Sequence, residues 1–170
     1  MEPLDHHRLG RTELSASRLG LGGMYVIDHY HRSRKDAERM IHRALDLGVN
    51  LIDTASSYFE SEEVFGDALQ GRRNDVIVAT KSYMRTRRRF LHEFEASFRH
   101  LRTDVIDIYQ LHHVQYPHEL EQAMAPGGVL EILKREQEKG RVRFIGITSH
   151  HPGVLVDALR TGEFDTVQFP

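Results

Sequence analysis

The sequence predicts an α/β fold in which parallel strands alternate with helices, and it favours a (β/α)₈ barrel over a doubly wound sheet. Short β-rich segments alternate with amphipathic helical segments along the 170 residues. Polar or ionisable residues follow four consecutive predicted strands. The G-x-G-x-x-G turn that is typical of a doubly wound nucleotide-binding sheet is incomplete, since residues 19–24 read Leu-Gly-Leu-Gly-Gly-Met.

Six segments have the composition of β-strands. They are residues 18–24, 50–54, 76–80, 105–111, 143–147 and 166–169. Strands that are joined through helices run parallel, and their crossovers are right-handed. The segment 76–80 is almost entirely apolar, as expected for a strand that is covered on both faces.

Five segments between these strands have the periodicity of amphipathic helices. They are residues 36–47, 61–69, 90–101, 129–138 and 152–159. Gly48 follows the first segment as a C-cap residue, and Pro152 opens the last one. Residues 8–15 contain the turn of a small β-hairpin, which we expect to cap the bottom of the barrel.

The composition excludes several classes of protein. The formal net charge is −2, so no bulk electrostatic attraction to nucleic acid or a membrane surface is expected. The absence of cysteine excludes disulfides and thiolate metal sites within these residues. No apolar run approaches the roughly 20 residues of a membrane-spanning helix, and the N-terminus lacks the hydrophobic core of a signal peptide. We therefore expect a cytoplasmic protein.

The polar residues that follow the predicted strands define a candidate active site. Asp53 and Tyr58 follow the second strand, Lys81 the third, His112 the fourth and Ser149 the fifth. In a (β/α)₈ barrel these strand ends form the face on which active sites lie. Each residue alone has an ordinary structural explanation, such as a helix cap for Asp53 or a packed core position for His112. Their joint placement on one rim favours function.

These residue types suit the reduction of a carbonyl group. A tyrosine has an unperturbed pKa of about 10, and a neighbouring lysine ammonium favours the phenolate and lowers that pKa. A buried aspartate keeps the lysine charged, and a histidine can orient a carbonyl oxygen. Together they would place a proton donor beside the oxyanion that develops as hydride reaches the carbonyl carbon.

Five stretches of the chain resemble the aldo-keto reductase family. They are Gly48–Tyr58, Val78–Lys81, Thr103–His112, Arg143–Ser149 and Asp165–Pro170. The resemblance runs from about residue 8 to the last residue and implies NADPH-dependent reduction of an aldehyde or ketone, a small-molecule substrate. It further implies Tyr58 as the general acid, Asp53 and Lys81 as the residues that tune it, and His112 as the residue that orients the carbonyl.

The resemblance also implies a set of cofactor-binding residues. Ser149 and Gln168 would hold the nicotinamide carboxamide, with Asp53 nearby. Gly22, Gly23 and Met24 would line the other side of the cofactor. The family usually has Ser-Asn after the fifth strand, whereas this chain has Ser149-His150, which places that further contact in question. The segments at residues 125–128 and 150–152 are similar to a branch of the family whose members sometimes carry a C-terminal ferredoxin-like extension.

The predicted strands number six, whereas a complete barrel has eight. In the family, the seventh strand supplies a residue that stacks on the nicotinamide, and the loops after strands seven and eight bind the phosphates. We therefore expect residues 1–170 to form a single barrel domain that is truncated at its C-terminal side. As an isolated chain it should be inactive or weakly active, and it should self-associate through exposed barrel edges.

Two alternative functions stay open on the sequence alone. One is a regulatory member of the family that binds cofactor without rapid turnover, which the complete set of candidate catalytic residues disfavours. The other is a metal-dependent hydrolase on the same fold. Adjacent histidines such as His112 and His113 suggest metal, but neighbouring residues on a strand face opposite sides, so we expect no metal site. Residues 85–89, rich in arginine, are either a solvated rim or a contact for an anion.

Overall fold

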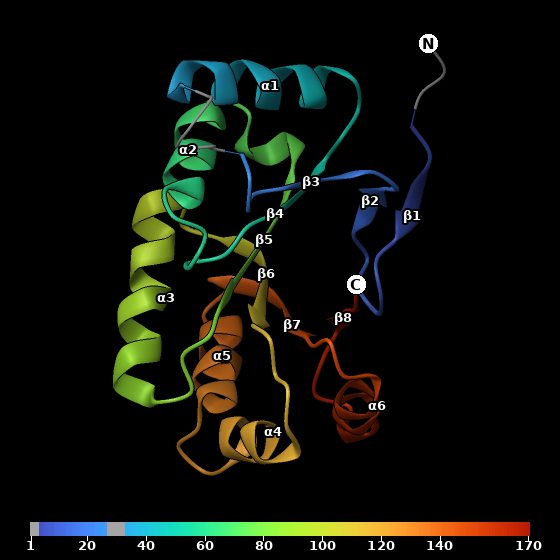
Figure 1. Ribbon diagram of the computed structural model, residues 1–170, viewed down its shortest axis with the longest axis vertical. Coiled ribbons are helices and arrows are strands. Elements are labelled where there is room, and N and C mark those ends of the chain that lie inside the picture. Colours follow the sequence, from blue (N-terminus) through green and yellow to red (C-terminus); the bar gives the residue numbers. More distant parts are fainter. Residues whose placement is uncertain (1–3, 27–32) are drawn as a thin grey trace.

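A computed structural model describes residues 4–26 and 33–170 of the chain. Within them, six parallel strands form one sheet in the order β3-β4-β5-β6-β7-β8. The sheet curls into an incomplete (β/α)₈ barrel, as predicted (Figure 1). The strands are β3 (Gly20–Gly22), β4 (Leu51–Asp53), β5 (Ile77–Ser82), β6 (Ile106–Leu111), β7 (Val142–Thr148) and β8 (Thr166–Gln168). Residues 1–3 and 27–32 lie outside the described residues. Residues 1–3 are the start of the N-terminus, where we expected no signal peptide.

Helices cover the outer face of the sheet. They are α1 (Arg34–Asp46), α2 (Ser61–Ala68), α3 (Arg87–Leu101), α4 (Pro117–Met124), α5 (Val129–Glu138) and α6 (Pro152–Thr161), with a short 3₁₀ helix at Arg73–Asp75. The five expected helices are present, although α3 begins at Arg87 rather than at residue 90. None of the helices in the described residues has the length and apolar character needed to cross a bilayer.

Helix α4 was not expected from the sequence. Pro117 opens it, and the Glu119 carboxylate accepts hydrogen bonds from the backbone N–H groups of Gln115 (2.7 Å) and Tyr116 (3.1 Å) at its start. Only Leu120 and Ala123 are buried along its length. This apolar stripe is too short to give a clear helical period, so the signal that identified the other helices is weak here.

The N-terminal hairpin caps the bottom of the barrel, as expected. Strands β1 (His6–Arg8) and β2 (Ser15–Ser17) pair antiparallel. Leu14 and Ala16 pack against inward-facing side chains of the sheet, including Ile77 and Ile108. The backbone N–H of Arg11 donates to the carbonyl oxygen of Asp165, 3.0 Å away and directly before β8. In Figure 1 the hairpin lies beside the C-terminal strand.

The inner face of the sheet changes from apolar to polar along β5 and β6. Ile77 and Ala79 on β5 and Ile108 on β6 belong to the apolar cluster beneath the hairpin. Two residues further along each strand, and so on the same face, stand Lys81 and Gln110, which are paired in register. Because all six strands are parallel, these polar positions meet at one end of the barrel.

Candidate active site

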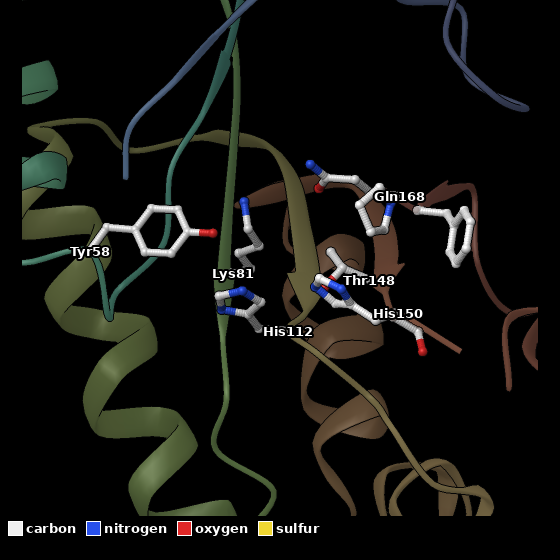
Figure 2. A pocket seen from close by; sticks show the side chains of 9 residues that line it. Tyr58, Lys81, His112, Thr148, His150 and Gln168 are labelled. Atoms are coloured by element: carbon white, nitrogen blue, oxygen red, sulfur yellow. The ribbon is translucent and has the colours of Figure 1, made fainter. Parts of the chain in front are cut away.

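A pocket of about 140 Å³ opens at the C-terminal ends of the strands (Figure 2). It is lined by Tyr58, Lys81, His112, Thr148, Ser149, His150, Gln168, Phe169 and Pro170. Three of the four expected catalytic residues therefore line one pocket, and the fourth, Asp53, is bonded to Lys81. Two of the expected cofactor-binding residues, Ser149 and Gln168, line it as well.

Lys81 projects from β5 into the base of this pocket. Its side chain is only 2% exposed. The ammonium Nζ donates to Oδ1 of Asp53 at 2.7 Å and to the backbone oxygen of Thr54 at 2.8 Å. Burial lowers the pKa of Lys81, and the negative charge of Asp53 opposes that shift. The paired carboxylate thereby favours a charged ammonium in a site that excludes water.

Tyr58 lies on the loop between β4 and α2, and Figure 2 shows its hydroxyl directed towards Lys81 and His112. Its ring centroid lies 5.2 Å from Nζ of Lys81 and 5.6 Å from the ring of His112. Burial raises the pKa of Tyr58 to about 12, and the negative charge of Asp53 adds to this shift. We expected Lys81 to lower this pKa. The difference arises because the Lys81 ammonium is engaged by Asp53 and burial dominates.

His112 is a neutral imidazole at the mouth of the site. Burial, followed by the charge of Lys81, lowers the pKa of His112 to about 3. Its Nδ1 is buried and has no hydrogen-bond partner among the described residues. The ring stacks on Tyr83 with centroids 3.9 Å apart. A neutral imidazole can donate a hydrogen bond to a carbonyl oxygen without transferring a proton.

Gln168 connects strands that lie far apart in the sequence. Its Nε2 donates to Oδ2 of Asp53 at 3.3 Å, and its Oε1 accepts from Nε2 of Gln110 at 3.3 Å. Ser149 is 1% exposed, and its hydroxyl is engaged with the backbone of His151 at the start of α6. Both residues thus lie at the pocket, and each is already hydrogen-bonded within the protein: Gln168 to Asp53 and Gln110, and Ser149 to His151.

Gly22, Gly23 and Met24 lie outside the lining of this pocket. Gly22 pairs in register with Asp53, and a Cβ added to it would meet no atom within 4 Å. A Cβ on Gly23 would lie 2.9 Å from Oγ1 of Thr54 and closer still to Oγ of Ser61. Close packing is therefore sufficient reason for glycine at position 23. Met24 is 49% exposed.

Sequence reasoning missed two residues at the site, Gln110 and Thr148, and did not distinguish Arg85 from the arginines that follow it. Gln110 stands two positions before His112, so the alternation of a strand could have identified it. Thr148 lines the pocket and accepts a hydrogen bond of 2.8 Å from the backbone N–H of His113. Arg85 donates to the backbone oxygen of His112 at 2.5 Å. Arg85 is thus half-buried and bonded to the strand end of His112, whereas Arg87, Arg88 and Arg89 are exposed.

The histidine pairs do not assemble a ligand set for a metal. The rings of His113 and His150 lie 5.1 Å apart at the rim. Among residues 4–26 and 33–170, no group of three or more His, Cys, Asp or Glu side chains is arranged to hold a metal ion.

Comparison with known proteins gives one consistent result. The model of the aldo/keto reductase family matches residues 18–169. The oxidoreductase YqkF of Bacillus subtilis is 30% identical over 90% of this chain and 51% of its own length. The aldo-keto reductase YhdN of the same organism is 32% identical over 86% of this chain and 47% of its own length. The chain thus spans about half the length of these curated relatives.

Solved structures agree with the sequence comparisons. The holo form of an aldo-keto reductase from Bacillus halodurans is 28% identical and superposes with a TM-score of 0.82, covering 98% of this chain and 57% of that chain. The glycerol dehydrogenase of Gluconobacter oxydans, also 28% identical, gives a TM-score of 0.77 over 98% of this chain and 55% of its own. On the family match, the shared fold and the pocket described above, the chain belongs to the aldo/keto reductase family.

Proposed function

We propose that this protein is an NADPH-dependent reductase of aldehydes or ketones in which Tyr58 acts as the general acid. The observation that carries the proposal is the convergence of Tyr58, Lys81 and His112 on one pocket, with Asp53 bonded to Lys81 beneath it. The hydroxyl, the ammonium pair and the neutral imidazole come from separate strands or loops. Independent structural roles would not require them to share one pocket.

The pocket suits the nicotinamide end of a dinucleotide. Its volume of about 140 Å³ is small beside the roughly 300–1,000 Å³ of sites that enclose a drug-sized ligand, so it accommodates a ring-sized group. A carboxamide needs both donors and acceptors. Ser149 and Gln168 offer both, and Oε1 of the neighbouring Gln110 is buried without a partner among the described residues. These residues would hold the carboxamide.

The chemistry that a reduced nicotinamide supplies when bound is hydride transfer to the carbonyl carbon. Tyr58 then donates its phenolic proton to the carbonyl oxygen, so that the added hydride and proton give an alcohol. With a pKa of about 12, Tyr58 is protonated near neutral pH, as a proton donor must be, although it is a weaker acid than a free tyrosine. The Lys81 ammonium stabilises the phenolate that remains after the proton has left.

His112 completes the arrangement by binding the carbonyl oxygen. Its low pKa keeps the imidazole neutral, so it orients the substrate with a hydrogen bond and leaves the proton transfer to Tyr58. The Asp53 carboxylate holds Lys81 in its charged form. A regulatory protein that only binds cofactor would gain nothing from an acid held in this way, which favours a reductase.

The proposal is tested in a chimera that joins residues 1–170 to the C-terminal half of the Bacillus subtilis relative YhdN. We expect the chimera to oxidise NADPH in the presence of a simple aldehyde. Tyr58→Phe should lower kcat by the roughly 10²–10⁴-fold that general acid catalysis contributes, with NADPH affinity little changed. Titration with NADPH checks that the chimera and its variant bind the cofactor. A Phe variant as fast as the parent chimera would rule out Tyr58 as the acid.

A further inference from the structure

The carboxylate of Glu93 on α3 contacts two of the segments that carry the candidate catalytic residues. Its Oε2 accepts hydrogen bonds from Oγ of Ser56 at 2.7 Å and from Oγ of Ser82 at 2.5 Å. Ser56 lies two positions before Tyr58, and Ser82 directly follows Lys81. One oxygen atom of an outer helix therefore joins the loop after β4 to the end of β5.

Backbone hydrogen bonds extend this junction to the other candidate residues. The N–H of Ser56 donates to the carbonyl oxygen of Lys81 at 3.0 Å. The carbonyl oxygen of Ser82 accepts from the N–H of His112 at 3.0 Å. Glu93 thus binds two serines that join three segments. These are the loop of Tyr58, strand β5 with Lys81, and the end of β6, which His112 follows.

The position of Tyr58 depends strongly on its loop. Its hydroxyl forms no hydrogen bond with residues 4–26 or 33–170, and the ring lies near Lys81 and His112, as described above. The backbone N–H of Tyr58 donates to the carbonyl oxygen of Ala55, within the same loop. The carbonyl oxygen of Tyr58 accepts from the N–H of Ser61 at the start of α2, at 2.9 Å. Ser56 bonds the first part of the loop to β5 and α3.

We propose that Glu93 is a positioning residue that fixes the loop of Tyr58 relative to Lys81, and so sets where the phenolic hydroxyl enters the pocket. The proposal rests on the reductase function proposed above for Tyr58. Charged hydrogen bonds are stronger and more directional than neutral ones, which suits a carboxylate to this task. Glu93 itself does not line the pocket and acts only through Ser56 and Ser82.

The alternative is that Glu93 merely anchors α3 and contributes to overall stability. The chain offers a matched control in Glu95, on the same helix, whose carboxylate binds Arg141 at 2.8 Å and 2.9 Å. Glu93→Leu and Glu95→Leu each remove one carboxylate and its hydrogen bonds from α3. Only the first removes the carboxylate that binds Ser56 and Ser82, and it leaves the Ser56 hydroxyl with the carbonyl oxygen of Lys81, at 3.2 Å, as its acceptor. Glu93→Gln keeps an acceptor oxygen for both serines and serves as the conservative variant.

The experiment is hydrogen–deuterium exchange, read by mass spectrometry, on the 170-residue chain and the three variants. In Glu93→Leu we expect peptides covering residues 54–60 to exchange about tenfold faster or more, because the loop loses its hydrogen bond to a charged acceptor. Peptides of β6 and α5 should keep the exchange rates of the unaltered chain. Glu93→Gln should restore slow exchange at residues 54–60, and Glu95→Leu should leave it slow.

Three results in the variants would overturn the proposal. They are unchanged exchange at residues 54–60 in Glu93→Leu, acceleration spread evenly over the chain, and equal acceleration there in Glu95→Leu. Absence of protection at residues 54–60 in the unaltered chain would also overturn it, since there would be no fixed loop to hold. These readings need no catalysis or cofactor. Failure of the reductase function would instead appear as a folded chimera without turnover, and failure of the role of Tyr58 as turnover that survives Tyr58→Phe.

Discussion

The ammonium of Lys81 and the carboxylate of Asp53 form a direct hydrogen-bonded ion pair, with Nζ 2.7 Å from Oδ1. The lysine side chain is 2% exposed and the aspartate side chain 25% exposed, so the pair lies between the dry interior and the pocket. Burial lowers the pKa of the lysine, and the charge of Asp53 opposes that shift. The ion pair therefore bears on the stability of the chain as well as on the proposed chemistry.

Asp53→Asn should destabilise the chain by about 2 kcal/mol, below the roughly 3–5 kcal/mol of a fully buried pair because Asp53 is partly exposed. The variant leaves a buried ammonium without its counter-charge. Urea unfolding followed by circular dichroism, at one fixed protein concentration, measures the loss. Adding Lys81→Met should recover part of it, since the unpaired charge is then gone. A double variant whose loss equals the sum of the two single losses would contradict this account.

The stability of the chain should fall in acid because of His112. Its pKa of about 3 in the folded protein lies below the ordinary histidine value of about 6.5, so the unfolded chain binds the proton more readily. The stability linked to this group is present above about pH 6.5 and is lost as the pH falls towards 3. Between about pH 7 and pH 5 the unaltered chain should lose about 2 kcal/mol more than His112→Asn.

Urea titrations at the two pH values measure that difference. His92→Asn, on the exposed face of α3, is the control and should follow the unaltered chain. Parallel losses in the unaltered chain and in His112→Asn would show that His112 is not the group responsible.

Two adjacent glycines should respond differently to alanine. A Cβ at position 23 would approach Thr54 and Ser61 too closely, whereas a Cβ at position 22 meets nothing within 4 Å. Overpacking of a tight site costs about 1–3 kcal/mol, so Gly23→Ala should lower the free energy of unfolding by that amount. Gly22→Ala should change it little. Thermal unfolding of the two variants decides the matter, and equal effects would count against the packing explanation for Gly23.

The open sheet should cause the 170-residue chain to self-associate. β3 and β8 are the outer strands of the described sheet, and exposed strand edges pair readily with other chains. Val167 on β8 is 40% exposed. A lysine at such an edge opposes pairing, so Val167→Lys should shift the chain towards monomer in size-exclusion chromatography. Val156→Lys, at a 45% exposed position on α6, is the control and should not.

The same isolated chain should bind NADPH weakly or not at all and should reduce carbonyls negligibly. Its pocket accommodates a ring-sized group, and the family places the phosphate contacts on loops after strands seven and eight. Fluorescence titration with NADPH measures the affinity. A monodisperse monomer that binds NADPH at micromolar concentration would contradict both this expectation and the self-association.

Local features of the sequence determined the order of the strands and most of the helices. The stripe of apolar residues in α1 and the apolar run of β5 are properties of neighbouring residues, so they can be read without the fold. The same applies to Lys81 and His112, because each directly ends or follows a strand, and parallel strands bring such residues to one rim. Helix α4 was not predicted, because its buried stripe consists of only Leu120 and Ala123.

Only the tertiary structure decided the contacts that depend on curvature and burial. Gln168 reaches Asp53 across 115 positions of the sequence because the sheet curls, and no local pattern encodes that distance. The pKa of Tyr58 rises rather than falls because burial outweighs the nearby ammonium, and burial is a sum over the whole fold. Glu93 resembles any other glutamate of an amphipathic helix until the fold places Ser56 and Ser82 against it. The sequence thus determined which groups stand at the rim, and the packing of distant segments determined their geometry and their protonation.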